Sequence, residues 1–142
     1  MEESINVQGV NAMVGRFYHS ALNVPLKIFR ETLLQDIGKL VPFDAALWGT
    51  CDADAERFHS LATVGLDDEF ARNLELTRQI NPMYHHLIAN PDKPMDMSEL
   101  MGDKQFYKSD AYAQICMPFG IERALRTSCR DPRNQVYNLV AW

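Results

Sequence analysis

Two adjacent histidines, His85 and His86, stand in the chemically most suggestive stretch of the chain, "NPMYHHLIANPDKPMDMSEL". Imidazole ligates metal ions and titrates near neutral pH, so the pair first suggests a metal site. Neighbouring side chains on a helix point about 100° apart, however, and no His or Cys lies three or four positions from either histidine. We therefore expect no metal here, with one histidine facing inward and the other facing solvent.

Cysteine and cofactor chemistry give no stronger pattern. Cys51, Cys116 and Cys129 are odd in number and widely spaced, which fits neither a disulfide framework nor a CxxC metal clip. A heme iron needs an axial ligand, and four residues qualify by type: His59, His85, His86 and Cys116. Since no CxxCH motif accompanies them, we predict that the protein has no cofactor, with heme as the alternative.

The composition excludes several function classes. The sequence contains no nucleophile elbow, no glycine-rich phosphate loop and no HExxH, so we expect it not to be an enzyme. Its net charge of -5 argues against binding nucleic acid through this segment. No run approaches the roughly 18 apolar residues of a membrane span, and the acidic start lacks a signal-peptide core, so we predict a cytoplasmic location without membrane contact.

A set of aromatic and apolar residues is a better candidate for a binding site. Ligand pockets are mostly apolar and carry few polar groups, and Tyr or Trp can serve both purposes. The residues that we assign to such a pocket are Trp48, Phe58, His59, Met83, Tyr84, Leu87, Tyr112, Met117 and Phe119. The alternative for each of them is plain packing in a filled core.

Helices are expected first along the chain. Apolar residues recur at three and four positions across residues 11–40, which indicates amphipathic helix. Pro25 should start a second helix, with Asn23 as candidate cap and an end near Gly38. A further helix should follow Gly65, where Asp67 and Asp68 suit its N-terminus, and Ser109 or Asp110 should cap a short helix that Pro118 ends.

Two hairpins are expected between and after these helices. "FDAALWGTCD" and "RFHSLATVG" flank an acidic turn, and two extended runs flank "RDPRN" near the end of the chain. Strict alternation would place Phe58, Ser60, Ala62 and Val64 on one face of their strand. The basic cluster "RDPRNQ", with Arg123, Arg126 and Arg130 nearby, is typical of a solvated hairpin tip, and docking of a partner or of a further domain is the alternative. The order of elements predicts an α+β fold with helices packed against an antiparallel sheet.

The succession "FDAALWGTCD", "FHSLATVGLDDEF", "NPMYHHL" and "YAQICMPFGI", followed by the final hairpin, resembles the N-terminal sensor domains of LuxR-type transcriptional regulators. The resemblance implies a GAF/PAS-like five-stranded antiparallel sheet flanked by helices over residues 25–142, with residues 1–24 a helical segment that contributes a dimer contact. It implies a homodimer, a small-molecule signal of unknown identity, and a DNA-binding helix-turn-helix domain beyond Trp142. The hydrophobic end "NLVAW" also suggests a chain that continues.

The chain departs from the lactone-binding branch of that family at one motif. That branch carries a Trp and a Tyr ahead of an Asp-Pro, whereas this chain has Asn81-Pro82 and no Trp-x-x-x-Tyr before it. An amide cannot offer a ligand N–H the negative acceptor of a carboxylate, which puts a lactone ligand in doubt. Two rival functions stay open: a ligand-free dimerisation module, and a GAF-like sensor module of a signalling enzyme.

Overall fold

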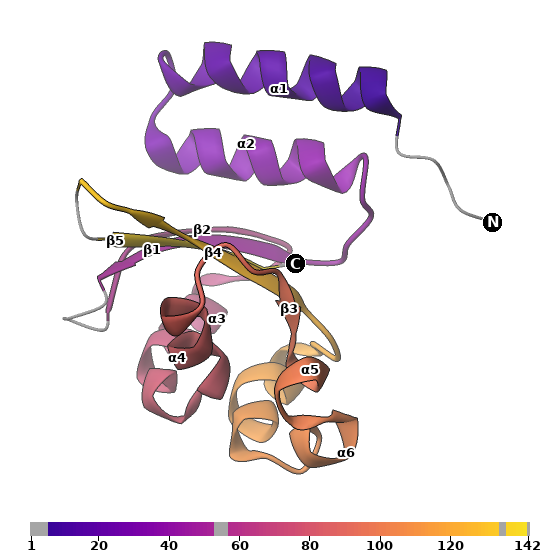
Figure 1. The fold of residues 1–142 in the computed structure, drawn as a ribbon, viewed down its shortest axis with the longest axis vertical. Helices are drawn as coiled ribbons and strands as arrows, with labels where there is room; N and C mark the ends of the chain where they lie inside the picture. Colours follow the sequence, from indigo (N-terminus) through magenta and orange to yellow (C-terminus); the bar gives the residue numbers. More distant parts are fainter. Residues whose placement is uncertain (1–5, 53–56, 134–135, 142) are drawn as a thin grey trace.

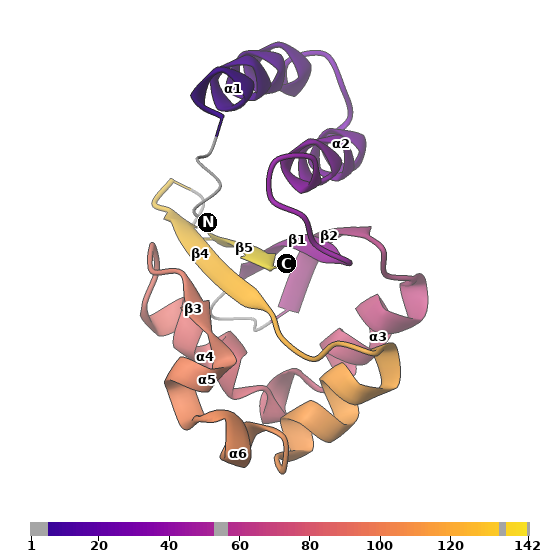
Figure 2. The ribbon, with the colours of Figure 1, turned by 90° about the vertical axis from the view of Figure 1, so that its right-hand side faces the viewer.

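Two layers of helices enclose one sheet. The computed structural model describes residues 6–52, 57–133 and 136–141. In Figure 1, helices α1 and α2 lie above the sheet and helices α3 to α6 lie below it. Helix α1 is stacked on α2 and is separated from the sheet by it, as Figure 2 shows from the side. The chain therefore has the mixed α+β class that its sequence predicts.

The upper layer consists of α1 (Val7–Ala21) and α2 (Leu26–Gly38). Pro25 precedes α2 and Gly38 ends it, as predicted. Asn23 does not cap α2, which corrects that expectation: its Nδ2 donates to the His19 carbonyl oxygen, 2.8 Å away, at the end of α1. The fixed φ of proline is sufficient to start the helix without a side-chain cap.

The sheet has five strands in the order β2-β1-β5-β4-β3, and every neighbouring pair is antiparallel. Both predicted hairpins are confirmed, and the two-residue β3 adds a short edge next to β4. The strands are β1 (Ala46–Asp52), β2 (Arg57–Val64), β3 (Met95–Asp96), β4 (Leu125–Asp131) and β5 (Val136–Ala141). Since β5 lies between β1 and β4, the pairing brings the starts of β1 and β4 to the same end of the sheet.

A β-bulge in β2 overturns the predicted alternation of that strand. Thr50 pairs with Ser60, but the next residue, Cys51, pairs with Phe58, so His59 is the extra residue. Ser60 bonds to a residue of α2, whereas the Phe58 ring packs against Tyr84 of α4. Phe58 and Ser60 thus lie on opposite faces of the sheet, because a bulge shifts the period of two by one residue.

The lower layer is a series of short helices with local caps. Asp67 accepts from the Phe70 N–H and caps its helix as predicted, and Ser109 Oγ accepts from the Tyr112 N–H. Pro118 does not end the last helix, which continues as a 3-10 turn up to Gly120. The elements are α3 (Asp68–Leu76), η1 (Arg78–Ile80), α4 (Pro82–Ala89), α5 (Met97–Met101), α6 (Asp103–Phe106), η2 (Tyr112–Cys116) and η3 (Met117–Phe119).

The main hydrophobic core lies between the sheet and this lower layer. Met83, Tyr84 and Leu87 of α4 reach it from one side and Phe106 from another, together with Cys51 of β1. Apolar burial of this kind is the dominant stabilising contribution to the fold. Within the described residues, no helix has both the length and the apolar character needed to cross a membrane.

Candidate functional site

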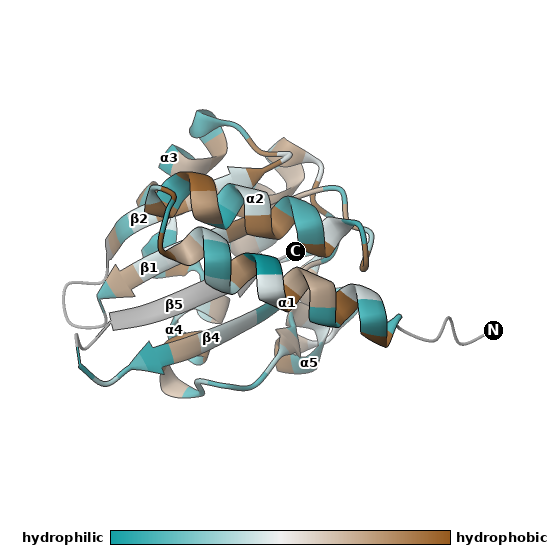
Figure 3. Cartoon of the chain, turned by 90° about the horizontal axis from the view of Figure 1, so that it is seen from above, coloured by the Kyte–Doolittle hydropathy of each residue, from teal (hydrophilic) through white to brown (hydrophobic). Residues whose placement is uncertain are grey.

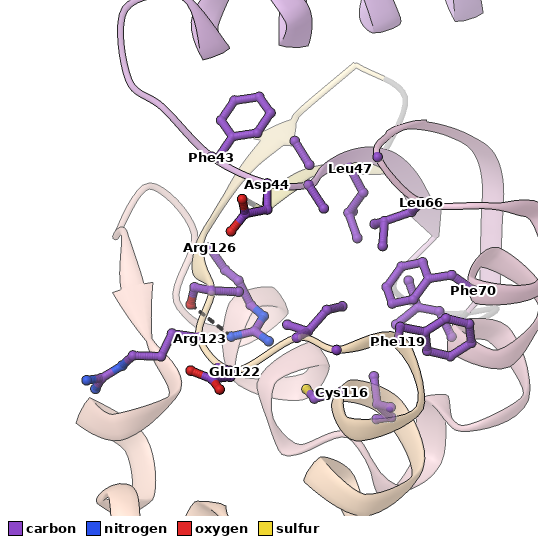
Figure 4. Close-up of a pocket in the computed structure, with 18 of the residues that line it drawn as sticks. Phe43, Asp44, Leu47, Leu66, Phe70, Cys116, Phe119, Glu122, Arg123 and Arg126 are labelled. Carbon is purple, nitrogen blue, oxygen red and sulfur yellow. Dashed lines mark hydrogen bonds between the residues drawn. The ribbon is translucent and has the colours of Figure 1, made fainter.

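A cavity of about 550 Å³ opens at the end of the sheet where β1 and β4 begin. Its walls come from the loop before β1, the turn after β2, helix α3, and the η2–η3 segment with the loop that follows it (Figure 4). Small-molecule sites in proteins have volumes of roughly 300–1,000 Å³. The cavity is therefore of ligand size and lies between two walls that are far apart in sequence.

One side of the cavity is apolar. Leu47, Leu66, Phe70 and Phe119 line it together in Figure 4. Ile115 of η2 is also among the residues that line the cavity. The Phe70 and Phe119 rings meet edge to face, with centroids 5.1 Å apart and planes at 90°. This arrangement is a favourable one for an aromatic pair and joins α3 to η3.

Two glycine turns position the cavity walls. Gly65 ends β2 with φ of +72°, and Gly120 ends η3 with φ of +68°, both in the left-handed region that favours glycine. A Cβ at Gly65 would collide with the backbone oxygen of Asp44, so the two loops touch without a side chain between them. Beyond Gly120, the Ile121 N–H donates to the Cys116 carbonyl oxygen at 3.0 Å.

The opposite side of the cavity carries a cation. Arg126 points into the cavity from β4, and its Nη1 donates to the Ala124 carbonyl oxygen at 3.1 Å. Arg123, in contrast, points away from the cavity in Figure 4 and forms ion pairs with Asp96 at 3.5 Å and Asp103 at 3.0 Å. Of the two arginines, only Arg126 directs its charge inward.

Burial shapes the titration of the groups around this cation. Burial lowers the pKa of Arg126, because removal from water disfavours the charged form. Burial likewise raises the pKa of the Cys116 thiol, and the nearby Arg126 opposes that rise. The cavity therefore presents a cation and a neutral thiol side by side.

The structure places the nine residues assigned to a pocket in four different environments. Phe119 lines the cavity. Trp48 lies on the other face of the sheet, against Phe29 of α2. The other seven are not among the described residues that line the cavity: Phe58, Met83, Tyr84, Leu87 and Tyr112 pack in or against the core, while His59 and Met117 are exposed.

The histidine pair behaves as its helical spacing predicts: His85 is exposed and His86 is half-buried on α4. Nowhere in the described parts of the chain do three or more His, Cys, Asp or Glu side chains gather around one point. His59 lies 3.7 Å from Asp52, on the bulge of β2. Of the four residues named for heme, Cys116 alone lines the cavity among the described lining residues.

Sequence reasoning did not identify the loops 42–45 and 120–124, nor the inward orientation of Arg126. Arg126 is not part of a solvated hairpin tip, which corrects the reading of the basic cluster. The structure explains this orientation: Ser128, two residues on, is buried and donates to the Leu87 carbonyl oxygen at 2.6 Å. Because side chains alternate along a strand with a period of two, Arg126 lies with Ser128 on the face of the sheet that α4 covers.

Comparison with solved structures identifies the fold. The LBD domain of VqsR from Pseudomonas aeruginosa matches with a TM-score of 0.67 and 10% identity, covering 93% of this chain and 77% of its own. CepR2 from Burkholderia cenocepacia, an N-acylhomoserine-lactone-dependent LuxR-family transcription factor, matches with 0.64 and 12%, covering 95% and 77%. This chain therefore shares the fold of these LuxR-family structures.

A GAF domain also shares this fold, from a phosphoenolpyruvate-protein phosphotransferase of Coxiella burnetii. It matches with a TM-score of 0.64 and 13% identity, covering 96% of this chain and 77% of its own. No family model matches the sequence, and neither does any curated protein. The resemblance to the sensor domains of LuxR-type regulators is thus confirmed at the level of the fold.

Proposed function

We propose that this chain is the signal-sensing domain of a LuxR-type transcriptional regulator, a binding module and not an enzyme. Its cavity holds a small molecule, and ligand binding controls a helix-turn-helix domain outside this chain. The observation that carries the proposal is the ligand-sized cavity between the sheet and the lower helices, in a fold shared with LuxR-family ligand-binding structures. A ligand regulates only if it binds one of two conformations more tightly.

The signal is proposed to differ from a lactone. CepR2 is described as dependent on N-acylhomoserine lactone, but Asn81 stands here where the lactone branch has a carboxylate. Asn81 lines the cavity, and its Oδ1 accepts from the Met83 N–H at 3.1 Å, where it caps α4. The amide oxygen is therefore already engaged by the backbone.

A thermal-melting screen against a metabolite panel tests ligand binding in the cavity. A compound that fits should raise the melting temperature of the wild-type protein, because it binds only the folded state. Leu66→Trp should fill part of the cavity and abolish that increase. Leu76→Trp, at an exposed position of α3, is the matched control and should leave it intact. Equal stabilisation of Leu66→Trp and Leu76→Trp by the same compound would contradict the proposal. So would a panel in which no compound stabilises the wild-type protein.

We also propose that the protein forms a homodimer through α1. This helix buries none of its residues within the described chain, yet Tyr18 is 77% exposed and Leu22 is 88% exposed. Val7 and Val14 are exposed on the same helix, and Figure 3 shows apolar positions along its outer surface. An uncovered apolar stripe of this kind is suited to pairing with a second copy.

Sedimentation measurements test the dimer. Tyr18→Glu should place a charge in the interface and shift the protein towards monomer, while Leu76→Glu in the lower layer should leave the association unchanged. A wild-type protein that is monomeric at high concentration would refute pairing through α1. A dimer without any ligand response would favour the ligand-free dimerisation module.

A sensor module of a signalling enzyme is the second candidate function, and the GAF match favours it. The coding sequence downstream of Trp142 discriminates between the two. A helix-turn-helix supports the regulator, whereas a kinase or phosphotransferase domain supports the rival.

A further inference from the structure

We propose that the cavity recognises an organic acid, with the carboxylate of the ligand bound by Arg126 and its apolar body packed on the opposite wall. The inference rests on the proposed sensing function and adds the chemical class of the signal. It follows from how charge and apolar surface are divided within the cavity.

The charge of Arg126 is only partly compensated by the protein. Its hydrogen bonds go to two uncharged groups, the Ala124 carbonyl oxygen and the Cys116 thiol, and Arg126 forms no ion pair with another described residue. The Asp96 carboxylate acts on the charge of Arg126, but Asp96 also accepts from the Ser98 N–H and pairs with Arg123. A guanidinium has five N–H donors in a planar fork, so several donors stay available for a ligand.

The carboxylates at the cavity do not make it a cation site. Asp44 and Glu122 line it, but both side chains are exposed, so water already solvates their charges. Arg126 is half-buried, and its guanidinium has lost part of its hydration. An electrostatic interaction is stronger where water is excluded. The charge of Arg126 therefore discriminates among ligands more strongly than the exposed carboxylates of Asp44 and Glu122 do.

The rest of the cavity specifies an amphipathic molecule. Figure 4 shows Leu47, Leu66, Phe70 and Phe119 on the side opposite Arg126. A guanidinium matches the two oxygens of a carboxylate in a bidentate geometry, and the facing wall accepts an alkyl chain or an aromatic ring. An acid of medium chain length, or an aromatic acid, satisfies both walls at once.

Acids and their amides give the direct test by calorimetric titration of the purified protein. Octanoate and cinnamate are the probes, and octanamide and cinnamamide are their neutral counterparts of the same shape. We expect each acid to bind at least roughly tenfold more tightly than its amide, since hydrogen bonds between charged groups are the strong ones. Acids and amides of equal affinity would overturn acid recognition and leave ligand sensing intact, and a failure of both acids to bind would overturn it too.

Arginine variants locate the interaction. Arg126→Gln should weaken acid binding roughly tenfold or more and leave amide binding unchanged, while Arg126→Lys should fall between, because an ammonium lacks the planar fork. Arg72→Gln is the matched control, since Arg72 is exposed on α3 and is not among the described residues that line the cavity, and acid binding should stay within about twofold of wild type. Unchanged acid affinity in Arg126→Gln would refute the assignment. If that variant does not fold, Arg126→Lys and the comparison of acid with amide decide the question.

Discussion

The guanidinium of Arg30 lies over the ring of Trp48, with its carbon 5.2 Å from the ring centroid. Arg30 belongs to α2 and Trp48 to β1, so the contact joins the upper helices to the sheet. Its Nη1 donates to Ser60 Oγ at 2.7 Å and its Nη2 to Thr50 Oγ1 at 2.6 Å. Arg30 is only 5% exposed, and burial lowers its pKa. A single side chain thus bonds α2 to two strands of the sheet.

Arg30→Ala should lower the free energy of unfolding by about 3 kcal/mol, through loss of packing and of the hydrogen bonds to two half-buried hydroxyls. Arg30→Lys should also destabilise, since an ammonium cannot donate in two directions from one plane. Urea unfolding measures both. Lys27→Ala, on the exposed side of α2, serves as the control and should change stability by about 0.5 kcal/mol or less. An Arg30→Ala variant with the same free energy of unfolding as the wild type would show that the contacts of Arg30 do not stabilise the fold.

The turn at Gly65 gives a second stability prediction. Gly65→Ala should destabilise the fold by about 2 kcal/mol or more, because φ of +72° is unfavourable for alanine and the new Cβ meets the Asp44 oxygen. Gly15→Ala is the contrasting variant: it lies in an exposed part of α1 with open space around it, and should stabilise by about 0.5–1 kcal/mol. Thermal unfolding of the two variants should therefore move in opposite directions.

The elements were predictable from the sequence because their signals are local. Pro25 fixes a helix start, Asp67 caps α3, and each hairpin has turn residues between two extended runs. The bulge at His59 was not predictable, because one inserted residue leaves no mark in the hydrophobic pattern. Because of the bulge, Phe58 lies on the face of the sheet opposite Ser60, and not on the same face as expected.

The cavity was harder to predict than the fold. Its lining comes from loops brought together only when β5 pairs with both β1 and β4. The aromatic residues that looked most like ligand contacts, such as Tyr84, are instead those that the core needs for packing. The inward orientation of Arg126 follows from its two-residue spacing from the buried Ser128, but that burial is visible only after folding, so the sequence did not reveal it.

Asp36 should make the attachment of α1 sensitive to acid. Its hydrogen bond with Lys39, with help from Arg16 of α1, holds the pKa of Asp36 below its ordinary value of 3.8. A depressed pKa contributes stability above the unfolded value, and that stability is lost as the pH falls through the folded value. Hydrogen exchange of α1 amides should therefore accelerate relative to the intrinsic exchange rate below about pH 4, which appears as lower protection factors.

Asp36→Asn should cause the same acceleration at neutral pH, because it removes the partner of Arg16, whose Nε lies 3.5 Å from the Asp36 carboxylate. Glu31→Gln is the control: Glu31 pairs with Lys27 within α2 and does not contribute to holding α1. Exchange in α1 that is identical in the two variants would show that packing alone holds the helix.

Cys129 and Cys51 should react with iodoacetamide in a defined order, since the thiolate is the reactive form. Cys129 is exposed and should be labelled first in the folded protein, although partial burial and the carboxylates of Asp92 and Asp131 raise its pKa. Cys51 is 0% exposed, and burial raises its pKa to about 11, so it should react only after unfolding. Mass spectrometry of labelled peptides, with Cys129→Ser as the control, gives the order.

The raised pKa of the Cys51 thiol predicts how the stability of the fold changes at alkaline pH. The folded pKa of Cys51 lies above its unfolded value of 9.0, so the neutral thiol contributes fully below pH 9 and its contribution is lost as the pH rises towards 11. We expect a loss of about 2 to 3 kcal/mol across that range from this residue. Cys51→Ala should flatten the pH dependence of urea unfolding between those values, whereas Cys129→Ser should retain most of it. A wild-type profile that is flat above pH 9 would contradict the buried, neutral state of Cys51.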